Sequence, residues 1–234
     1  MSESLERCQL LITPFLRPTP ALFLDRDGVV IEDCHHLSDP DQVRLCRGAR
    51  QLIAAAHSYG WPVVLITNQS GIARGFFGWD HVEQVNLRMK ELLRIEAPLA
   101  AIYANGHGPD APANSWRKPS PQMVLAASKA LNLELKRSLL VGDRLSDLQA
   151  GAAAGVAGLF HVLSGHGRDA RVSVQRWHAQ ATRPVPSLQL LDSLNSFQLD
   201  LFNQGNDRFH VPLDVLDLVR SGAEVTGVVA YDQA

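Results

Sequence analysis

The stretch Phe23-Leu-Asp-Arg-Asp-Gly28 places Asp25 and Asp27 directly after a short apolar run that begins at Ala21. Such a run, bounded by polar residues and glycine, predicts a buried strand over residues 21–25 that ends on an acid. The same kind of strand is predicted at four later places, which are residues 62–67, 100–104, 138–141 and 156–162. Segments with helical periodicity separate them, at residues 49–56, 82–93, 121–131 and 146–155. This alternation predicts an α/β fold in which a parallel sheet carries helices on both faces.

Further expectations concern the C-terminal part of the chain and its division into domains. A helix is expected over residues 169–180, with Val172 and Trp177 facing inward, and a last strand over 187–194. The expected domains are an N-terminal extension (1–20), a catalytic domain (21–197) and a C-terminal extension (198–234) packed on it. That last part has a helix-like segment at 211–219 and a strand-like one at 225–231. The short spacings around Thr67 leave no room for a large cap domain, which predicts an open site.

The composition excludes several classes of function. The 234 residues include 22 basic and 24 acidic ones, so no global field attracts nucleic acid or an anionic membrane. No stretch approaches the roughly 20 apolar residues of a membrane span. Cys8, Cys34 and Cys46 lack the spacing of a disulfide framework or a thiolate metal site. We therefore expect a soluble, cytoplasmic protein that binds no nucleic acid and no membrane.

Chemically distinctive side chains stand at the ends of these strands. Asp25, Thr67 and Asp143 end three of them, and Lys118 lies in the loop after a fourth. The carboxyl ends of parallel strands meet at one edge of the sheet, so these side chains are expected to lie together. A single strand-end aspartate is more often a helix cap or turn residue. Four such residues in this order favour one common site.

These residue types fit phosphoryl transfer. A phosphate ester repels nucleophiles, so its hydrolysis needs a carboxylate nucleophile, a cation that offsets charge and an acid for the leaving oxygen. Asp25 suits the nucleophile, and Asp27, two residues on, suits the acid and base. Mg²⁺ prefers oxygen ligands, which Asp25 and Asp143 offer. Lys118 supplies a point charge for the phosphoryl oxygens, and Thr67 with Asn68 supplies directional donors.

The chain resembles the haloacid dehalogenase superfamily of phosphatases, most closely its heptose-bisphosphate and histidinol-phosphate phosphatase branch. The resemblance covers about Ala21 to Val162 and rests on four motifs, which are Phe23–Gly28, Thr67–Gly75, Arg117–Pro119 and Gly142–Arg144 with Asp147. It implies a three-layer Rossmann-like fold and an aspartyl-phosphate intermediate. It further implies that Asp25 is the nucleophile, that Asp27 is the acid and base, and that Lys118 holds phosphate. The implied Mg²⁺ ligands are Asp25, Asp143 and the carbonyl of Asp27.

Within the branch, the extended second motif and the Arg-Lys-Pro sequence favour removal of the 7-phosphate from D-glycero-D-manno-heptose 1,7-bisphosphate. Arg117 and Arg144 would suit the second phosphate of such a sugar by bidentate contact. Asp33 and His36 lie where members of the branch contact substrate; an ordinary loop position is the alternative for His36, and a solvated charge the alternative for Arg144. The residues expected to bind phosphate or substrate are Thr67, Asn68, Gln69, Ser70, Arg117, Lys118, Arg144, Asp33 and His36.

One departure from the branch concerns zinc. Many members carry a zinc loop of three Cys and a His just before Arg-Lys-Pro, but residues 104–116 contain no Cys and His107 alone cannot make a tetrahedral site. We therefore predict Mg²⁺ as cofactor and no zinc. The alternatives are a phosphatase for another small metabolite, such as histidinol phosphate, and a catalytically silent phosphometabolite-binding or scaffold protein. A polynucleotide phosphatase is disfavoured because the chain lacks a basic, aromatic surface. A monomer or small homo-oligomer is expected.

Overall fold

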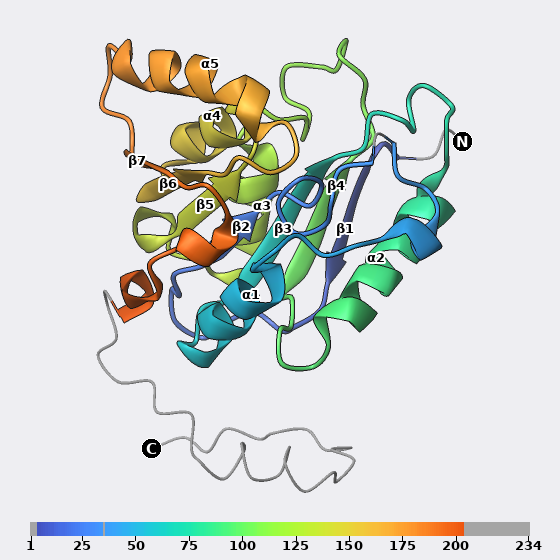
Figure 1. The fold of residues 1–234 in the computed structure, drawn as a ribbon, viewed down its shortest axis with the longest axis horizontal. Coiled ribbons are helices and arrows are strands. Elements are labelled where there is room, and N and C mark those ends of the chain that lie inside the picture. Colours follow the sequence, from blue (N-terminus) through green and yellow to red (C-terminus); the bar gives the residue numbers. More distant parts are fainter. Residues whose placement is uncertain (1–3, 35, 204–234) are drawn as a thin grey trace, which may run out of the picture.

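The fold is built on a seven-stranded sheet with strand order β1-β4-β3-β2-β5-β6-β7 (Figure 1). The structure is a computed structural model that describes residues 4–34 and 36–203. The strands are β1 (Glu6–Leu10), β2 (Leu22–Leu24), β3 (Val63–Asn68), β4 (Ala101–Asn105), β5 (Leu139–Gly142), β6 (Gly158–His161) and β7 (Ser187–Leu190). The helices are α1 (Ala49–Ser58), α2 (Trp79–Leu93), α3 (Gln122–Leu131), α4 (Leu145–Ala154) and α5 (Gly167–Ala179). Short 3-10 turns lie at Pro40–Gln42, Leu135–Arg137, Leu194–Ser196 and Leu199–Asn203.

The predicted α/β architecture is confirmed, with one strand added. Strands β2 to β7 pair in parallel, and β2 lies in the middle of the sheet between β3 and β5. The unpredicted strand β1 lies inside the expected N-terminal extension and pairs antiparallel with β4, with Glu6 opposite Asn105. Its five residues are all exposed or half-buried, so the apolar pattern by which a strand is found in the sequence is missing.

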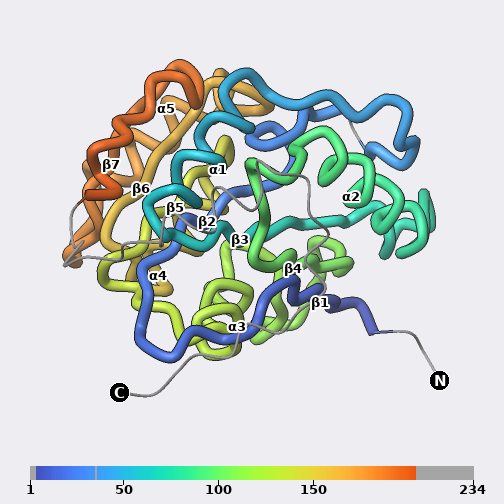
Figure 2. Tube along the Cα trace, turned by 90° about the horizontal axis from the view of Figure 1, so that it is seen from below, coloured from blue at the N-terminus to red at the C-terminus, as the bar shows by residue number. Residues whose placement is uncertain are grey.

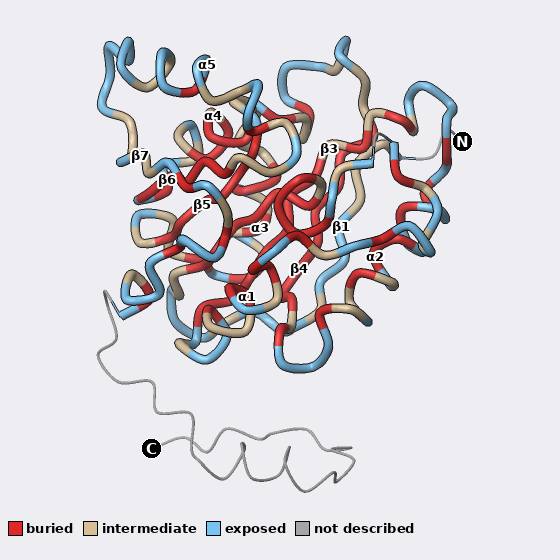
Figure 3. The backbone as a smooth tube through the Cα atoms, viewed as in Figure 1, coloured by how far each residue is buried: buried red, intermediate tan, exposed pale blue. Residues whose placement is uncertain are grey.

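Helices cover both faces of the sheet, because neighbouring side chains of each strand point to opposite sides. In β2, Leu22 and Leu24 belong to a core beneath α1 and α2, whereas Phe23 belongs to a second core beneath α3, α4 and α5. Figure 2 shows α1 and α2 on one side of the strands and α3 on the other. The central strands are buried along their whole length (Figure 3), which explains their continuous apolar sequences.

Two expectations about the C-terminal third have different outcomes. The helix predicted over 169–180 is α5, and Trp177 packs against the core as predicted. The prediction for Val172 was wrong, because Val172 is 62 % exposed and Val174 is the fully buried valine. The segments expected at 211–219 and 225–231 lie outside the described residues. Before that point, Phe202 is fully buried, and its carbonyl accepts a hydrogen bond from the Trp61 indole at 3.1 Å. The chain up to Asn203 therefore belongs to the α1 side of the core.

Candidate active site

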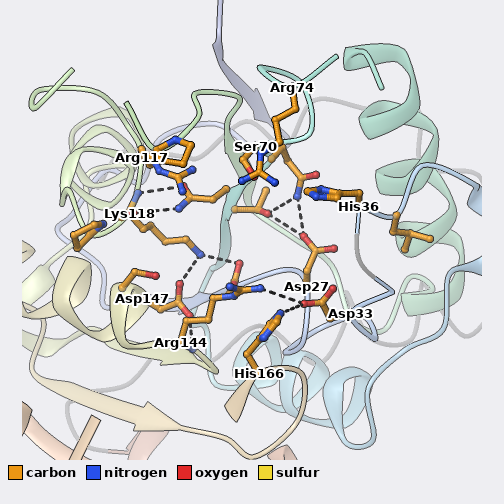
Figure 4. Close-up of a pocket in the computed structure, with 18 residues that line it drawn as sticks. Asp27, Asp33, His36, Ser70, Arg74, Arg117, Lys118, Arg144, Asp147 and His166 are labelled. Carbon is orange, nitrogen blue, oxygen red and sulfur yellow. Dashed lines mark hydrogen bonds and ion pairs between the residues drawn. The ribbon is translucent and has the colours of Figure 1, made fainter. Parts of the chain in front are cut away.

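Three of the predicted residues, Asp25, Thr67 and Lys118, line one cavity of about 630 Å³ at the carboxyl edge of the sheet (Figure 4). The fourth, Asp143, lies beside Asp25, with ligand atoms within 4.8 Å. Asp25 directly follows β2, Asp143 directly follows β5, Thr67 lies near the end of β3, and Lys118 enters from the loop between β4 and α3. Each of these four residues is at least 95 % buried, so the floor of the cavity is set by the packed sheet.

Lys118 joins two carboxylates at this floor. Its ammonium nitrogen lies 2.8 Å from Asp25 Oδ1 and 2.7 Å from Asp147 Oδ1, and it donates to the carbonyl of Ile66 at 3.0 Å. Asp25 Oδ1 also accepts from the backbone N–H of Arg26 at 2.7 Å. Among the described residues, Asp25 Oδ2 has no hydrogen-bond donor, so one carboxylate oxygen of Asp25 stays available to a ligand.

The buried acids repel one another, and this shows in their pKa values. Burial raises the pKa of Asp25 to about 7, and the charges of Asp147 and Asp27 add to the effect, while Lys118 opposes it. Burial likewise raises the pKa of Asp143 to about 8, with Asp147 and Asp25 adding to it. Lys118 responds in the opposite sense: burial lowers its pKa, but the Asp147 and Asp25 charges outweigh that and raise it. The floor therefore lacks positive charge.

A divalent cation fits this deficit. Ligand atoms of Asp25, Asp143 and Asp147 lie within 4.8 Å of one another, and all three residues are buried. Asp143 Oδ2 accepts from the His166 backbone N–H at 2.7 Å, but the buried Oδ1 has no hydrogen-bond partner in the described part of the chain. A buried oxygen without a donor is costly unless a cation or water satisfies it. Three carboxylates of this kind form the hard oxygen donor set that Mg²⁺ prefers.

Two glycines allow Asp143 to lie where it does. Gly28 has φ +83°, and a Cβ placed on it would lie 2.5 Å from Asp143 Oδ2. Gly165 has φ +54°, and its Cβ would lie 2.3 Å from the same oxygen. Both positions therefore require a residue without a side chain, for conformational and steric reasons together. The loops after β2 and β6 pack directly on this carboxylate.

Asp27 faces the cavity from the turn after β2 and accepts several hydrogen bonds. Its Oδ2 accepts from Gln69 Nε2 at 2.8 Å, from Thr67 Oγ1 at 3.2 Å and from Arg26 Nε at 3.2 Å. Its side chain is 22 % exposed, so one side of the carboxylate remains open to the cavity. The predicted pair Thr67 and Gln69 thus contacts Asp27 directly.

The Asn68 side chain forms hydrogen bonds with the backbone of Lys118, in the loop between β4 and α3. Its amide Nδ2 donates to the Lys118 carbonyl at 3.2 Å, and its Oδ1 accepts from the Lys118 N–H at 3.1 Å. This reciprocal pair fixes where the Lys118 side chain starts, although the sequence predicted a direct phosphate contact for Asn68. Ser70 lines the cavity as expected.

The rim of the cavity is formed by loop residues that are more exposed. Asp33 lies 2.9 Å from His166 Nε2 and 3.4 Å from Arg144 Nη2. His36 lines the cavity and contacts Phe76 edge-on at a centroid distance of 4.9 Å. The predicted Asp33, His36 and Arg144 therefore reach the same cavity as Asp25.

Two arginines flank the opposite part of the rim. Arg117 donates from Nη1 to the His107 carbonyl at 2.9 Å, and Arg74 lies beside it in Figure 4. Burial lowers the pKa of Arg117, and the charges of Arg74 and Arg144 lower it further. The guanidinium groups of the three arginines thus face the same space, which favours a strongly anionic ligand there.

Sequence reasoning left three ionisable residues of the cavity out of the proposed site. Asp147 was noted in the fourth motif, but its ion pair with Lys118 was not foreseen; full burial of an acid at the start of α4 is the structural sign. Arg74 is the last residue but one of the second motif, where its charge alone was no signal. His166 is distant in sequence and follows β6, so only the fold brings it to Asp33.

The loop without cysteines is held by the N-terminal strand. Glu6 of β1 accepts from the Trp116 N–H at 2.7 Å and lies 3.6 Å from His107 Nε2. His107 in turn accepts from Arg117 through its carbonyl. The absence of zinc stays a prediction. The loop before Arg117 is held in place by its contacts with Glu6 and by the hydrogen bond between Arg117 and His107.

Comparisons with known proteins agree with this geometry. The HAD-hydrolase-like family matches residues 115–191. The D-glycero-beta-D-manno-heptose-1,7-bisphosphate 7-phosphatase of Mesorhizobium japonicum is 50 % identical over 145 residues, covering 59 % of this chain and 67 % of the relative. The D-glycero-alpha-D-manno-heptose-1,7-bisphosphate 7-phosphatase of Burkholderia mallei is 38 % identical over 143 residues, covering 58 % and 76 %. The chain belongs to the haloacid dehalogenase-like phosphatases.

Solved structures of this phosphatase family share the fold. A HAD-like phosphatase from Mesorhizobium loti has a TM-score of 0.74 at 35 % identity, covering 89 % of this chain and 99 % of its own. The D,D-heptose 1,7-bisphosphate phosphatase from B. bronchiseptica, solved with magnesium and phosphate, has a TM-score of 0.66 at 32 % identity, covering 80 % and 100 %. The predicted family, fold class and enzyme class are confirmed, and magnesium is indicated.

In the described part of this phosphatase, residues 4–34 and 36–203, no helix combines the length and apolar character needed to cross a bilayer.

Proposed function

We propose that the protein removes the 7-phosphate of D-glycero-D-manno-heptose 1,7-bisphosphate in a Mg²⁺-dependent reaction. The observation that carries this proposal is the pairing of a buried acidic floor with three arginines on the same cavity. The floor, with Asp25, suits the phosphate that is cleaved. Arg74, Arg117 and Arg144 suit a second phosphate at the other end of a small molecule. Arg144 already pairs with Asp33, but a substrate with one phosphate would bring no counter-charge to Arg74 and Arg117.

The first chemical step is transfer of the phosphoryl group to Asp25. An oxygen of its carboxylate attacks the phosphorus while the bond from phosphorus to the sugar oxygen breaks. Asp27 gives its proton to that oxygen, so the sugar leaves as an alcohol and Asp27 is left as a carboxylate. The Arg26 N–H and the Lys118 ammonium on Oδ1 hold Asp25 in a fixed orientation for this attack.

The second step returns Asp25 to its starting state. The Asp27 carboxylate takes a proton from water, whose oxygen attacks the phosphorus of the aspartyl phosphate. The bond between phosphorus and the Asp25 oxygen breaks, which releases inorganic phosphate and leaves Asp27 protonated for the next turnover. Thr67 and Gln69 hold the Asp27 carboxylate at the cavity through both steps.

Asp25, Asp143 and the Asp27 carbonyl are the proposed ligands of Mg²⁺, with Asp147 as a neighbouring carboxylate. Support comes from the buried Asp143 Oδ1 without a donor and from the clustering of three acids. A bound divalent cation offsets the negative charge of the phosphoryl group and of the carboxylates. Lys118 neutralises part of the same charge from the protein side, which lets Asp25 and Asp147 approach a single ammonium.

The remaining assignments complete the proposal. Residues 21–197 would form the catalytic domain, with 1–20 and 198–234 as extensions of it. We propose a cytoplasmic monomer or small homo-oligomer without zinc. The absence of space for a large cap between Asp27 and Lys118 favours small phosphorylated metabolites as substrates.

The decisive experiment measures phosphate release from heptose 1,7-bisphosphate, fructose 1,6-bisphosphate and histidinol phosphate, with Mg²⁺ or with EDTA. We expect the highest rate on the heptose, dependence on Mg²⁺, and loss of turnover in Asp25→Asn. A preference for histidinol phosphate would keep the mechanism and overturn the substrate. No release from any compound by folded, Mg²⁺-bound protein would favour the phosphometabolite-binding alternative.

A further inference from the structure

Arg26 is a buried cation that the reaction described above does not use. It stands between the two catalytic aspartates in sequence, and its residue is 1 % exposed. A guanidinium group stays charged at all physiological pH values, so its burial is costly unless all sides are paired. The structure therefore has to supply fixed partners for it.

The main partner of Arg26 is the proposed acid and base. Nε lies 3.2 Å from Asp27 Oδ2, and Nη2 lies 3.1 Å from Asp27 Oδ1, so the guanidinium grips both carboxylate oxygens. This bidentate geometry fixes the plane of the carboxylate as well as its distance. Arg26 is buried and does not line the cavity, whereas Asp27 does. The two hydrogen bonds from Arg26 therefore leave the side of Asp27 that faces the cavity open.

Asn86 anchors the guanidinium from behind. Arg26 Nη1 donates to Asn86 Oδ1 at 2.9 Å, and Asn86 is a buried residue of α2. The packed helix thereby prevents the guanidinium from swinging away. A polar side chain on the core-facing side of a helix is unusual unless it has such a partner.

We propose that Arg26 and Asn86 are positioning residues that aim the Asp27 carboxyl at the leaving oxygen. This inference rests on the proposed function, because it requires Asp27 to be the acid and base. Asn86 holds the guanidinium, and the guanidinium holds the plane of the carboxylate. Neither residue needs to touch the substrate, since both lie behind Asp27.

The test compares two phosphate esters that differ in their need for an acid. p-Nitrophenyl phosphate releases p-nitrophenolate, which leaves without a proton. The sugar bisphosphate releases an alkoxide, which needs a proton from an acid. We would measure the rate of alcohol release in a single turnover with Mg²⁺ for Arg26→Lys, Asn86→Leu and Asp27→Asn. The positioning role predicts that Arg26→Lys and Asn86→Leu lose about 10-fold or more on the sugar bisphosphate and under about 3-fold on p-nitrophenyl phosphate.

Two further variants separate positioning from general damage. Val85→Ala removes fully buried atoms from the same helix and keeps the hydrogen-bonding groups of Arg26 and Asn86, so it should slow both esters equally or not at all. The double variant Arg26→Lys/Asp27→Asn should be no slower on the sugar than Asp27→Asn alone, because the two residues act as one unit. If Arg26→Lys does not fold, Asn86→Leu carries the same test.

The outcomes distinguish the two proposals. Equal losses on both esters in Arg26→Lys and Asn86→Leu would overturn the positioning role while leaving Asp27 as acid. An Asp27→Asn variant that slows both esters equally would overturn the assignment of Asp27 itself, and the role of Arg26 with it. A loss restricted to the sugar ester in all three variants would support both proposals.

Discussion

The floor and the rim of the cavity are built in different ways. The floor consists of the buried residues Asp25, Asp143, Asp147 and Lys118. Asp25 and Asp143 follow strand ends, Asp147 lies in the first turn of α4, and Lys118 lies in the loop between β4 and α3. The rim consists of loop side chains, such as Arg144, whose side chain is 49 % exposed. Lys118 of the floor contacts Asp25, Asp147 and the carbonyl of Ile66, whereas the ion pair of Arg144 is made with Asp33, another rim residue.

This difference separates reaction from recognition. A floor fixed by a packed sheet suits chemistry that depends on accurate placement of a nucleophile. A rim of exposed charges on loops can change with less cost to the fold, because loops tolerate substitution better than strands. We therefore expect floor variants to abolish turnover and rim variants to change which molecule is turned over.

The largest effect is expected at the floor. Asp25→Asn removes the attacking oxygen, so turnover should fall by at least about 10³-fold. The free energy of unfolding in EDTA should stay the same or rise, since the variant removes a buried carboxylate that is crowded by other acids. Denaturant titration and phosphate release measure the two. Asp200→Asn, an exposed acid, serves as the matched control; turnover above a tenth of wild type in Asp25→Asn would contradict its role.

The next effect concerns the glycine beside Asp143. Gly28→Ala adds a Cβ that would lie 2.5 Å from Asp143 Oδ2, at a positive φ. We expect a loss of about 1–3 kcal/mol in the free energy of unfolding. Mg²⁺ affinity, measured by isothermal titration calorimetry, should fall as well. Gly60→Ala is the control, because its φ of +75° is also positive but nothing lies within 4 Å of the added Cβ. Equal results for both would show that Asp143 is not displaced.

A third test uses pH to probe the charge of the floor. The pKa of Asp25 is raised to about 7 and that of Asp143 to about 8, from an ordinary pKa of 3.8 for an aspartate. Above pH 3.8 the folded protein therefore binds more protons at these sites than the unfolded chain. The free energy of unfolding in EDTA should therefore fall as pH rises from about 4 to 8. Mg²⁺ should stabilise the protein more at the upper end of this window. A Mg²⁺ effect that is larger at low pH would contradict this account.

A fourth prediction concerns the rim. Arg144→Gln removes a guanidinium from the proposed site of the second phosphate. We expect KM for the heptose bisphosphate to rise by about 10-fold while kcat changes little. The corresponding heptose monophosphate should show no such rise. Arg183→Gln, an exposed arginine away from the cavity, is the control. A fall in kcat without a change in KM would place Arg144 with the floor.

The smallest effect is expected where β1 holds the rim loop. Glu6→Gln keeps a hydrogen-bond acceptor for Trp116 but loses the charge beside His107. A loss of at most about 1 kcal/mol in the free energy of unfolding is expected, since Glu6 is partly exposed. KM for the heptose bisphosphate should rise slightly, because His107, which lies beside Glu6, accepts a hydrogen bond from Arg117. Thermal unfolding and steady-state kinetics measure both, with Glu96→Gln as control. A large loss of kcat would show that this loop belongs functionally to the floor.

The sequence predicted the floor better than the rim, for a physical reason. Strands β2 to β6 are buried on both faces, so their apolar runs stand out, and the residues that follow them share one edge by topology. The resemblance then gave Asp25 and Lys118 their roles. Strand β1 was not predicted, because its side chains are exposed or half-buried and only its antiparallel pairing with β4 defines it as a strand.

Other features depend on three-dimensional neighbours that no spacing encodes. Asp147 is identified by its ion pair with Lys118, and His166 by its contact with Asp33. Val172 was predicted to face inward, whereas the valine of α5 that packs on the core with Trp177 is Val174. Arg26 is conspicuous only once Asn86 is known to lie behind it.

The antiparallel pairing of β1 has a consequence for how the protein is made. The segment around Glu6 leaves the ribosome before the other strands of the sheet, yet its partner strand β4 ends at Asn105, about a hundred residues later. During synthesis the first segment must therefore wait, unpaired, while β2 and β3 form beside each other. Because this pairing can form only after β4 has been made, the loop that carries Arg117 is held in place later than β2 and β3 pair. The newly made chain thus pairs its first parallel strands before it fixes its recognition loop.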